Sequence, residues 1–557
     1  MIVKNLRGGT SARFLSSAVA LAASAAAIAW PGAASAYFGD SFLSIPGSKG
    51  HWRGSDHKEW IRAESSDWPG RLPKLVSGGT DALAGDKLWF GGPNAPKPNR
   101  GGGKLMIALS HDNPDLAVLM KLCAQGTVIP ELNYDESADL ARPPLELGDR
   151  PKEFPAFWQY KLENAVVSDC PTLKGAIDTA IVITFKNIQW LNYDPDRPMA
   201  NKIVVQPEDI PQVKPANSPA GETSNSYLVT WFAPATTTTD EECPSLNHKA
   251  TEADVYRYMT PEEVAALKAK NGTKGLTFGT DTERRGPHKI SVAVFPGVIP
   301  DPGLFEPKTN VANGIDLDGN DGSGSPPTGI RKHGNYVSPD GRKGIDNQLF
   351  RINGCVPGNR GKRGYSNQTP NARRADGNVI NLIEVTGPGD GKRDGDVNVA
   401  FIYARDKPIR DNAGKTFISN YTFRPTDDPN FSLYNFRLHG TMKDGVVTTD
   451  RVPLLKINPG QGPLIKIHNA VLRLEPQADG TMKGWLGGYL EWKRIAISSG
   501  YSEGLFDFQT PALYYAFKRF ADGLKNPVSG EYEGISTAYE IDTVPAFLTS
   551  SDKPSGK

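Results

Sequence analysis

The chain has 557 residues, of which 38% are hydrophobic and 22% are charged, a composition typical of globular rather than disordered proteins. This length exceeds one ordinary hydrophobic core and predicts two or three domains. The 63 Lys and Arg against 62 Asp and Glu give a net charge of +1, so no general electrostatic attraction to nucleic acid or anionic membranes is expected.

Residues 1–36 predict a cleavable export signal. Three basic residues precede an apolar, Ala-rich run over 14–30, and Ala-Ser-Ala at 34–36 has the small residues that signal peptidase needs. A membrane anchor is the alternative, but the run is short and is followed by a cleavage site. The mature chain should therefore begin at Tyr37, lie in the periplasm or outside the cell, and have no membrane span. Without the leader it has 60 Lys and Arg against 62 Asp and Glu.

Residues 37–194 predict one β-rich unit with a single substantial helix. The stretches "FWQYKLENAVVSDC" (157–170) and "IVITFKNIQWLNYD" (181–194) alternate polar and apolar side chains, as half-buried strands do. The helix is predicted over 113–126, with Asn113 as its cap, a proline in the first turn and a terminal glycine.

This unit resembles the Hcp family, the tube proteins of type VI secretion systems. The resemblance is carried, in chain order, by "HKEWIRAESSDWPG", "GGGKLMIALSHDNPDLAVLMKLCAQGTVIPELNY" and the two strands quoted above. It covers roughly 37–194. An unrelated small β-barrel with one helix is the alternative.

The resemblance implies a compact β-barrel of two sheets with one helix, in subunits that stack as hexameric rings. It supplies no catalytic residues. Residues 71–100 and 133–156 are interpreted as insertions that would obstruct stacking. Because a secretion tube is built in the cytoplasm, an exported copy could not join it by the usual route. We therefore expect an assembly or adhesion module that is monomeric or self-associates into a single ring.

Residues 195–223 are rich in Pro, Asn, Ser and Gly and are interpreted as a linker. Residues 224–557 predict a β-rich, sandwich-like domain of unknown function, with long loops over 310–378 and a helix near the C-terminus, "PALYYAFKRFADGL". A short helix is predicted at 260–272. This part resembles an uncharacterised exported bacterial family through "ERRGPH", "GIDLDGNDG", "GIDNQLFRINGC", "LGGYLEW" and "ISTAYEIDTVPAF".

The four cysteines are widely spaced and contain no C-x-x-C motif, which argues against a metal knuckle or a redox motif. An even number in an oxidising compartment predicts two disulfides, for which three connectivities exist. We favour Cys123–Cys170 and Cys243–Cys355, because each pair then stays within one proposed domain. Four buried free thiols are the alternative.

The segment "GIDLDGNDGSG" (314–324) is the strongest candidate for a metal site. Hard oxygen ligands at alternate positions among glycines suit Ca²⁺. The loop is not an EF-hand, since its seventh position is Gly and its twelfth is Pro. An Asx-rich turn with solvated carboxylates is the alternative. Asp340, Asp346 or Asn347 would add ligands if the two loops meet. The predicted calcium ligands are Asp316, Asp318, Asn320 and Asp321.

The other polar groups give weaker signals. The stretch "GPGDGKRDGDVN" (387–398) predicts a hairpin tip and lacks the pattern of a phosphate loop. The basic segment 359–374, which includes Tyr365, is interpreted as a solvated loop, with a polyanion site as the alternative. Four histidines on or beside predicted strands are interpreted as packed or surface residues: His51, His57, His439 and His468.

These observations predict an exported, non-enzymatic structural or binding protein related to type VI secretion, with no catalytic residue singled out. The alternative is an exported hydrolase that acts on cell-wall or extracellular polymer through residues 224–557, since a glycosidase pair among the many carboxylates stays open. Carboxylates facing each other across a deep cleft would favour the hydrolase.

Overall fold

The computed structural model describes residues 37–54, 57–67, 102–137, 153–155, 157–170, 172, 175–190, 202–204, 224–243, 261, 265, 269, most of 296–495, and 510–549. The predicted signal peptide and the insertion at 71–100 lie outside the described residues, as do most of the linker, of the second insertion and of the helix at 260–272. Within the described residues, no helix has the length and apolar character needed to cross a membrane.

The first barrel is built from a seven-stranded antiparallel sheet in the described part of the N-terminal region. The sheet has the order β4-β1-β2-β3-β7-β6-β8, and an additional pairing between β4 and β6 closes it. A separate pair is formed by β5 (Glu153–Pro155) and β9 (Lys202–Val204). The strands are β1 (Tyr37–Ser44), β2 (Ile61–Asp67), β3 (Gly103–Ser110), β4 (Val128–Ser137), β6 (Phe157–Asp169), β7 (Asp178–Phe185) and β8 (Asn187–Trp190).

The alternating side chains of these strands fill the interior of the first barrel. Leu105 and Ile107 on β3, Leu132 on β4, and Ile181 and Ile183 on β7 are all fully buried in one cluster. Alternate residues point to opposite faces of a strand, so the sequence pattern and the closed ladder agree.

The predicted helix is present as α1 (Leu116–Gln125) and ends at Gly126, whose φ of 59° is left-handed. Its start differs from the prediction, because Asp115 rather than Asn113 is the N-cap. Asn113 instead accepts a hydrogen bond from the backbone N–H of Asp115 and donates one to the carbonyl of Arg62.

The second barrel is formed by a larger sheet, which follows the order β10-β11-β12-β14-β15-β17-β18-β20 and closes through pairing of β10 with β20. The domain is β-rich with long loops, as the sequence predicts, and the ladder in addition closes on itself. Its strands are β10 (Ser224–Pro234), β11 (Asn381–Thr386), β12 (Gly395–Tyr403), β14 (Phe436–Lys443), β15 (Val446–Thr449), β17 (Ile465–Pro476), β18 (Met482–Glu491) and β20 (Tyr532–Leu548).

Shorter elements lie around the second barrel. Three further strands pair at its margins: β13 (Tyr421–Phe423) and β19 (Gly523–Lys525) with β20, and β16 (Val452–Ile457) with β17. The helices are α4 (Gln348–Asn353), α5 (Tyr365–Ala375), α7 (Pro429–Ser432) and α9 (Thr510–Phe520), with 3-10 turns η8 (Pro296–Val298) and η9 (Pro357–Asn359).

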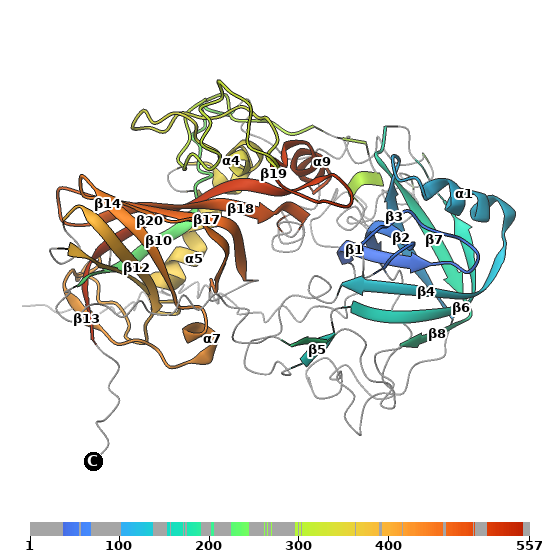
Figure 1. Cartoon of the computed structure of the whole chain (residues 1–557), viewed down its shortest axis with the longest axis horizontal. Coiled ribbons are helices and arrows are strands. Elements are labelled where there is room, and N and C mark those ends of the chain that lie inside the picture. Colours follow the sequence, from blue (N-terminus) through green and yellow to red (C-terminus); the bar gives the residue numbers. More distant parts are fainter. Residues whose placement is uncertain are drawn as a thin grey trace, which may run out of the picture.

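The predicted C-terminal helix is α9, although β19 and β20 follow it along the chain. Its Leu513, Ala516 and Phe517 are buried in the second core. Figure 1 shows α9 and η8 between the blue and teal first barrel and the orange and red second barrel. Helix α9 therefore lies at the contact between the two barrels, where Tyr514 reaches Asp178 of the first barrel.

The basic segment 359–374 is not a solvated loop over most of its length, because α5 begins at Tyr365. Arg374 on α5 is buried, lies 5.8 Å from the ring of Phe232 and contacts the side chain of Asn381. Burial lowers the pKa of Arg374 to about 10. The prediction of a solvated loop was wrong here, because the packing of α5 buries the guanidinium group of Arg374. The segment 387–398 does connect β11 to β12 as a hairpin.

The structure contains the disulfide pairing that the sequence favours. Cys123 of α1 is bonded to Cys170 after β6, with Cα atoms 6.5 Å apart, and Cys243 is bonded to Cys355 with Cα atoms 5.5 Å apart. The second bond joins the segment after β10 to the segment after α4, across 112 residues.

Candidate functional site

The acidic loop 314–324 folds as a series of Asx turns. Gly319 and Gly322 have φ values of 74° and 89°, which allow the chain to reverse direction tightly. Each of the four predicted calcium ligands accepts a hydrogen bond from a backbone N–H two or three residues further on: Asp316, Asp318, Asn320 and Asp321.

The second loop meets the first through Asp346. Its backbone N–H donates to the carbonyl of Ile315, and its Oδ2 accepts from the N–H of Leu317 at 2.6 Å and of Asp318 at 3.1 Å. The other two residues that could have added ligands do not take part. Asp340 pairs with Arg342, and Asn347 caps α4.

Asp318 and Asp346 converge with His333 and Asp522, and we call these four residues the acidic centre. One ligand atom each from Asp318, His333 and Asp346 lie within 4.8 Å of one another. The Nε2 of His333 is 3.5 Å from Oδ1 of Asp346 and 3.2 Å from Oδ2 of Asp522. The side chains of Asp346 and Asp522 are fully buried, and that of His333 is 8% exposed.

Backbone groups fix one oxygen of each buried acid. Asp346 is held by Leu317 and Asp318, while Oδ1 of Asp522 accepts from the N–H of Ser536 at 2.8 Å. The opposite atoms, Oδ1 of Asp346 and Oδ2 of Asp522, are buried and make no hydrogen bond within the described residues. The same holds for Nε2 of His333 and for the hydroxyl of Tyr489.

Burial shifts the pKa values of the acids of this centre upward. Burial, together with the charge of Asp318, raises the pKa of Asp346 to about 8. Burial also raises the pKa of Asp522 to about 6, opposed by the charge of His333. Burial and the nearby acids raise the pKa of Tyr489 above its usual range, opposed by Arg451. Unpaired negative charge in a buried site is costly unless a cation or a proton balances it.

His333 and Asp522 were missed by sequence reasoning. They lie 189 positions apart, and neither belongs to a motif with metal-ligand spacing. The four histidines interpreted as packed or surface residues each lie against one carboxylate: His51 on Asp115, His57 on Asp135, His439 on Asp450 and His468 on Glu491.

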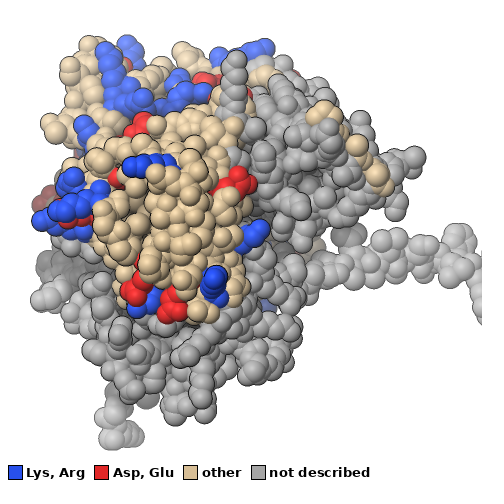
Figure 2. All heavy atoms as spheres, turned by 90° about the vertical axis from the view of Figure 1, so that its right-hand side faces the viewer, with Lys and Arg blue, Asp and Glu red and all other residues tan. Residues whose placement is uncertain are grey.

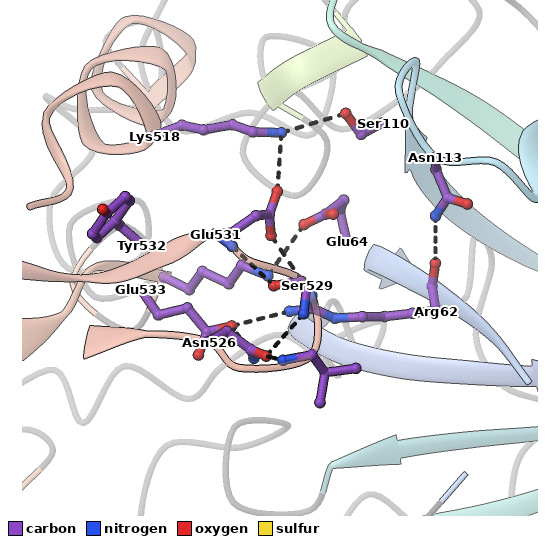
Figure 3. A network of polar contacts seen from close by, with 12 residues as sticks. Arg62, Glu64, Ser110, Asn113, Lys518, Asn526, Ser529, Glu531, Tyr532 and Glu533 are labelled. Carbon is purple, nitrogen blue, oxygen red and sulfur yellow. Dashed lines mark hydrogen bonds and ion pairs between the residues drawn. The ribbon is translucent and has the colours of Figure 1, made fainter. Parts of the chain in front are cut away.

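A second polar cluster joins the two barrels (Figure 3). Arg62 and Glu64 of β2 point outward, because the alternating residues Ile61 and Ala63 point into the first core. Both outward side chains are nevertheless buried, with residue exposures of 8%. The Nζ of Lys493 lies 3.1 Å from Oε2 of Glu64.

The same cluster extends along α9 and β20. Arg62 lies 3.3 Å from Glu533 and 3.6 Å from Glu531. Tyr514 of α9 donates a hydrogen bond to Oδ2 of Asp178 at 2.9 Å. We call the following set the barrel–barrel interface: Arg62, Glu64 and Asp178 of the first barrel, and Lys493, Tyr514, Lys518, Glu531 and Glu533.

Burial and charge act in opposite directions on two acids of this interface. Burial would raise the pKa of Glu64, but the charges of Lys493, Arg62 and Lys518 outweigh it and hold this pKa well below its usual range. Burial raises the pKa of Asp178 to about 7, because the charge of Lys518 offsets burial only in part. Glu64 is therefore ionised, and Asp178 takes up a proton near neutral pH.

Asp178→Asn is expected to change how stability depends on pH. Below pH 4 Asp178 is protonated in both the folded and the unfolded state, so it does not lower the free energy of unfolding there. Between pH 4 and 7 only the unfolded state ionises, so the wild-type chain loses stability as pH rises, by about 2–4 kcal/mol over this window. The amide removes this loss. Urea unfolding of both proteins from pH 4 to 8 measures the difference.

The exposed acid Asp169, on β6 of the same barrel, gives the matched control variant Asp169→Asn. Its difference from wild type should stay constant over the window. A constant difference for Asp178→Asn as well would show that Asp178 is not protonated in the folded chain.

The comparisons with known proteins concern the N-terminal part. No family model and no curated protein matches the chain. Among solved structures, Hcp2 from Salmonella typhimurium is 16% identical over 27% of this chain and 84% of that one, with a TM-score of 0.17. Hcp1 from the same organism is 17% identical over 28% and 81%, with a TM-score of 0.16. A type VI secretion system effector from Yersinia pestis is 11% identical over 29% and 95%, with a TM-score of 0.15. The likeness is thus a weak and partial one to the Hcp fold.

Proposed function

We propose that this chain is an exported, non-enzymatic structural protein in which the first barrel serves as an assembly or adhesion module fixed to the second barrel. The observation that carries the proposal is the burial of Arg62 and Glu64. In a free barrel these outward charges of β2 would face water, whereas here they pair with Lys493, Glu531 and Glu533. This face of the first barrel therefore has charges whose partners lie in the second barrel.

The closed ladders support a structural role that uses side-chain surfaces. A closed ladder leaves few unpaired strand edges along its wall, so partners would bind mainly through faces and loops. On the barrel side seen in Figure 2, Lys and Arg lie together with Asp and Glu, and uncharged residues fill much of the described surface between them. This mixture favours a protein partner over a polyanion.

The burial of the acidic centre favours a structural over a hydrolytic role. A glycosidase needs two carboxylates that reach a glycosidic bond. Asp346 and Asp522 are instead fully buried and are held by backbone N–H groups. A polymer chain cannot reach acids in such a position without a large rearrangement.

The mature chain is expected to be a monomer or a single ring in solution. The second barrel occupies one side of the first barrel and adds bulk that stacked rings would have to clear. Light scattering gives the mass, and electron microscopy of the same sample shows the particle shape. Long tubes formed by the intact chain would contradict the proposal. The proposal would also be contradicted if the chain released fragments from cell-wall polymer and Asp346→Asn abolished that release. This result would favour the hydrolase.

A further inference from the structure

We propose that the acidic centre binds one divalent transition-metal ion, with zinc as the expected occupant, through Asp318, His333, Asp346 and Asp522. This site goes beyond the structural role proposed above. It also differs from the predicted calcium loop, of which it includes only Asp318.

The orientation of the donors is the first argument. Metal-binding carboxylates and histidines are commonly held by hydrogen bonds to the atom that does not bind the metal. In Asp346 and Asp522 one oxygen accepts from backbone N–H groups, and the other is buried without a hydrogen bond beside Nε2 of His333. The Nδ1 of His333 lies 3.4 Å from the carbonyl of Gly334, which can accept its proton when Nε2 binds a metal. In Asp346, Asp522 and His333, the atom opposite the proposed metal-binding atom is therefore held by the backbone.

The spacing of the donors is the second argument. Zinc bonds of about 2.0–2.1 Å in tetrahedral geometry place neighbouring ligand atoms about 3.3–3.4 Å apart. The Nε2 of His333 is 3.2 Å from Asp522 and 3.5 Å from Asp346. A ligand atom of Asp318 lies within 4.8 Å of those of His333 and Asp346, so a small inward rotation completes the set.

Charge is the third argument. Three carboxylates surround one imidazole, and two of the three are fully buried. A protonated His333 would balance one charge and account for its two short distances, but it would leave the buried hydroxyl of Tyr489 without a hydrogen bond among the described residues. A dication balances two charges and gives the buried oxygens of Asp346 and Asp522 that lack hydrogen bonds a partner.

The donor chemistry selects the metal. Ca²⁺ takes six to eight oxygen ligands, whereas an imidazole nitrogen suits zinc and its neighbours in the first transition row. Four protein ligands without an open position define a structural zinc site. Here the ion would tie the loops around Asp318 and His333 to Asp522, which lies directly before β19. The metal would therefore stabilise the loops over 311–347.

The test uses the full mature chain, stripped with EDTA and titrated with zinc against a coloured chelator. We expect one zinc per chain. Asp346→Asn keeps an oxygen for the N–H of Leu317 and should lower zinc affinity tenfold to a hundredfold, as should His333→Gln. The matched control is Asp321→Asn, an exposed acid of the same loop outside the centre, whose affinity should stay within twofold. Equal affinities of wild type and Asp346→Asn would overturn the proposal.

Thermal unfolding separates binding from folding. Zinc at a hundredfold excess over its dissociation constant should raise the unfolding temperature of wild type by about 5 °C and leave Asp346→Asn unchanged. If both variants fail to fold, cobalt added to wild type still reports the site through the visible absorption of a tetrahedral ion. No cobalt spectrum and no bound zinc would overturn the proposal. If the chain binds calcium and Asp321→Asn weakens that binding, the metal lies in the predicted calcium loop. This result would also overturn the proposal.

Discussion

Replacing Glu64 by Ala is expected to lower the free energy of unfolding by about 3–5 kcal/mol, because it leaves buried positive charge without its partner. The side chains of Lys493 and Glu64 are only 12% and 10% exposed, so water cannot compensate for the lost carboxylate. Arg62 and Lys518 also lose the attraction of Glu64, although each still lies beside Glu531. Calorimetry of the full chain measures the effect. The wild type should unfold with coupled barrels, and the variant should show the first barrel unfolding separately.

The first barrel also offers a matched exposed pair, Lys161 with Glu131 at 2.8 Å, whose side chains are 27% and 47% exposed. Glu131→Ala should cost less than about 1 kcal/mol, because exposed pairs contribute little. The double variant Glu64→Gln/Lys493→Met should recover much of the loss, since removing both charges leaves none unpaired. Equal effects of Glu64→Ala and Glu131→Ala would show that the barrel–barrel interface is solvated.

Replacing Cys243 and Cys355 together by Ala should lower the free energy of unfolding by about 4–5 kcal/mol, because the bond closes a loop of more than a hundred residues in the unfolded chain. The sequence separation is 112, and both cysteines are buried. The loss should appear in urea unfolding as a lower midpoint. The predicted effect is on the second barrel, where the bond joins the segments after β10 and α4.

Reduction provides the control for the cysteine variant. A thiol reductant should lower the midpoint of wild type, through both bonds, by more than it lowers that of the double variant, which retains only Cys123–Cys170. A double variant as stable as the oxidised wild type would mean that the bond contributes no net stability.

The sequence predicted local features well where one periodicity decided the structure. Alternation in 157–170 and 181–194 predicted strands, and β6, β7 and β8 follow, although the second stretch is interrupted at Lys186. The proline in the first turn and Gly126 predicted α1 and its end, although the N-cap is Asp115 rather than Asn113. These elements depend on neighbours within a few positions, which a single sequence contains.

The features that were missed depend on contacts between distant parts of the chain. Nothing near Arg62 or Glu64 in the sequence indicates that another domain will cover the outward face of β2. His333 meets Asp522 only because the loops before α4 fold against the segment after α9. The condition attached to Asp346, that the two loops meet, is fulfilled in the structure. A metal there stays a proposal.

The pairing of β10 with β20 has a consequence for the order of events during synthesis. Residues 224–234 leave the ribosome about three hundred positions before their partner 532–548. Until then β10 has only β11 beside it, and β18 lacks its neighbour on one side. Such open edges are sites of intermolecular pairing in a growing chain. The second barrel can therefore close only after nearly all of its residues have emerged, and its open strand edges stay exposed during that interval.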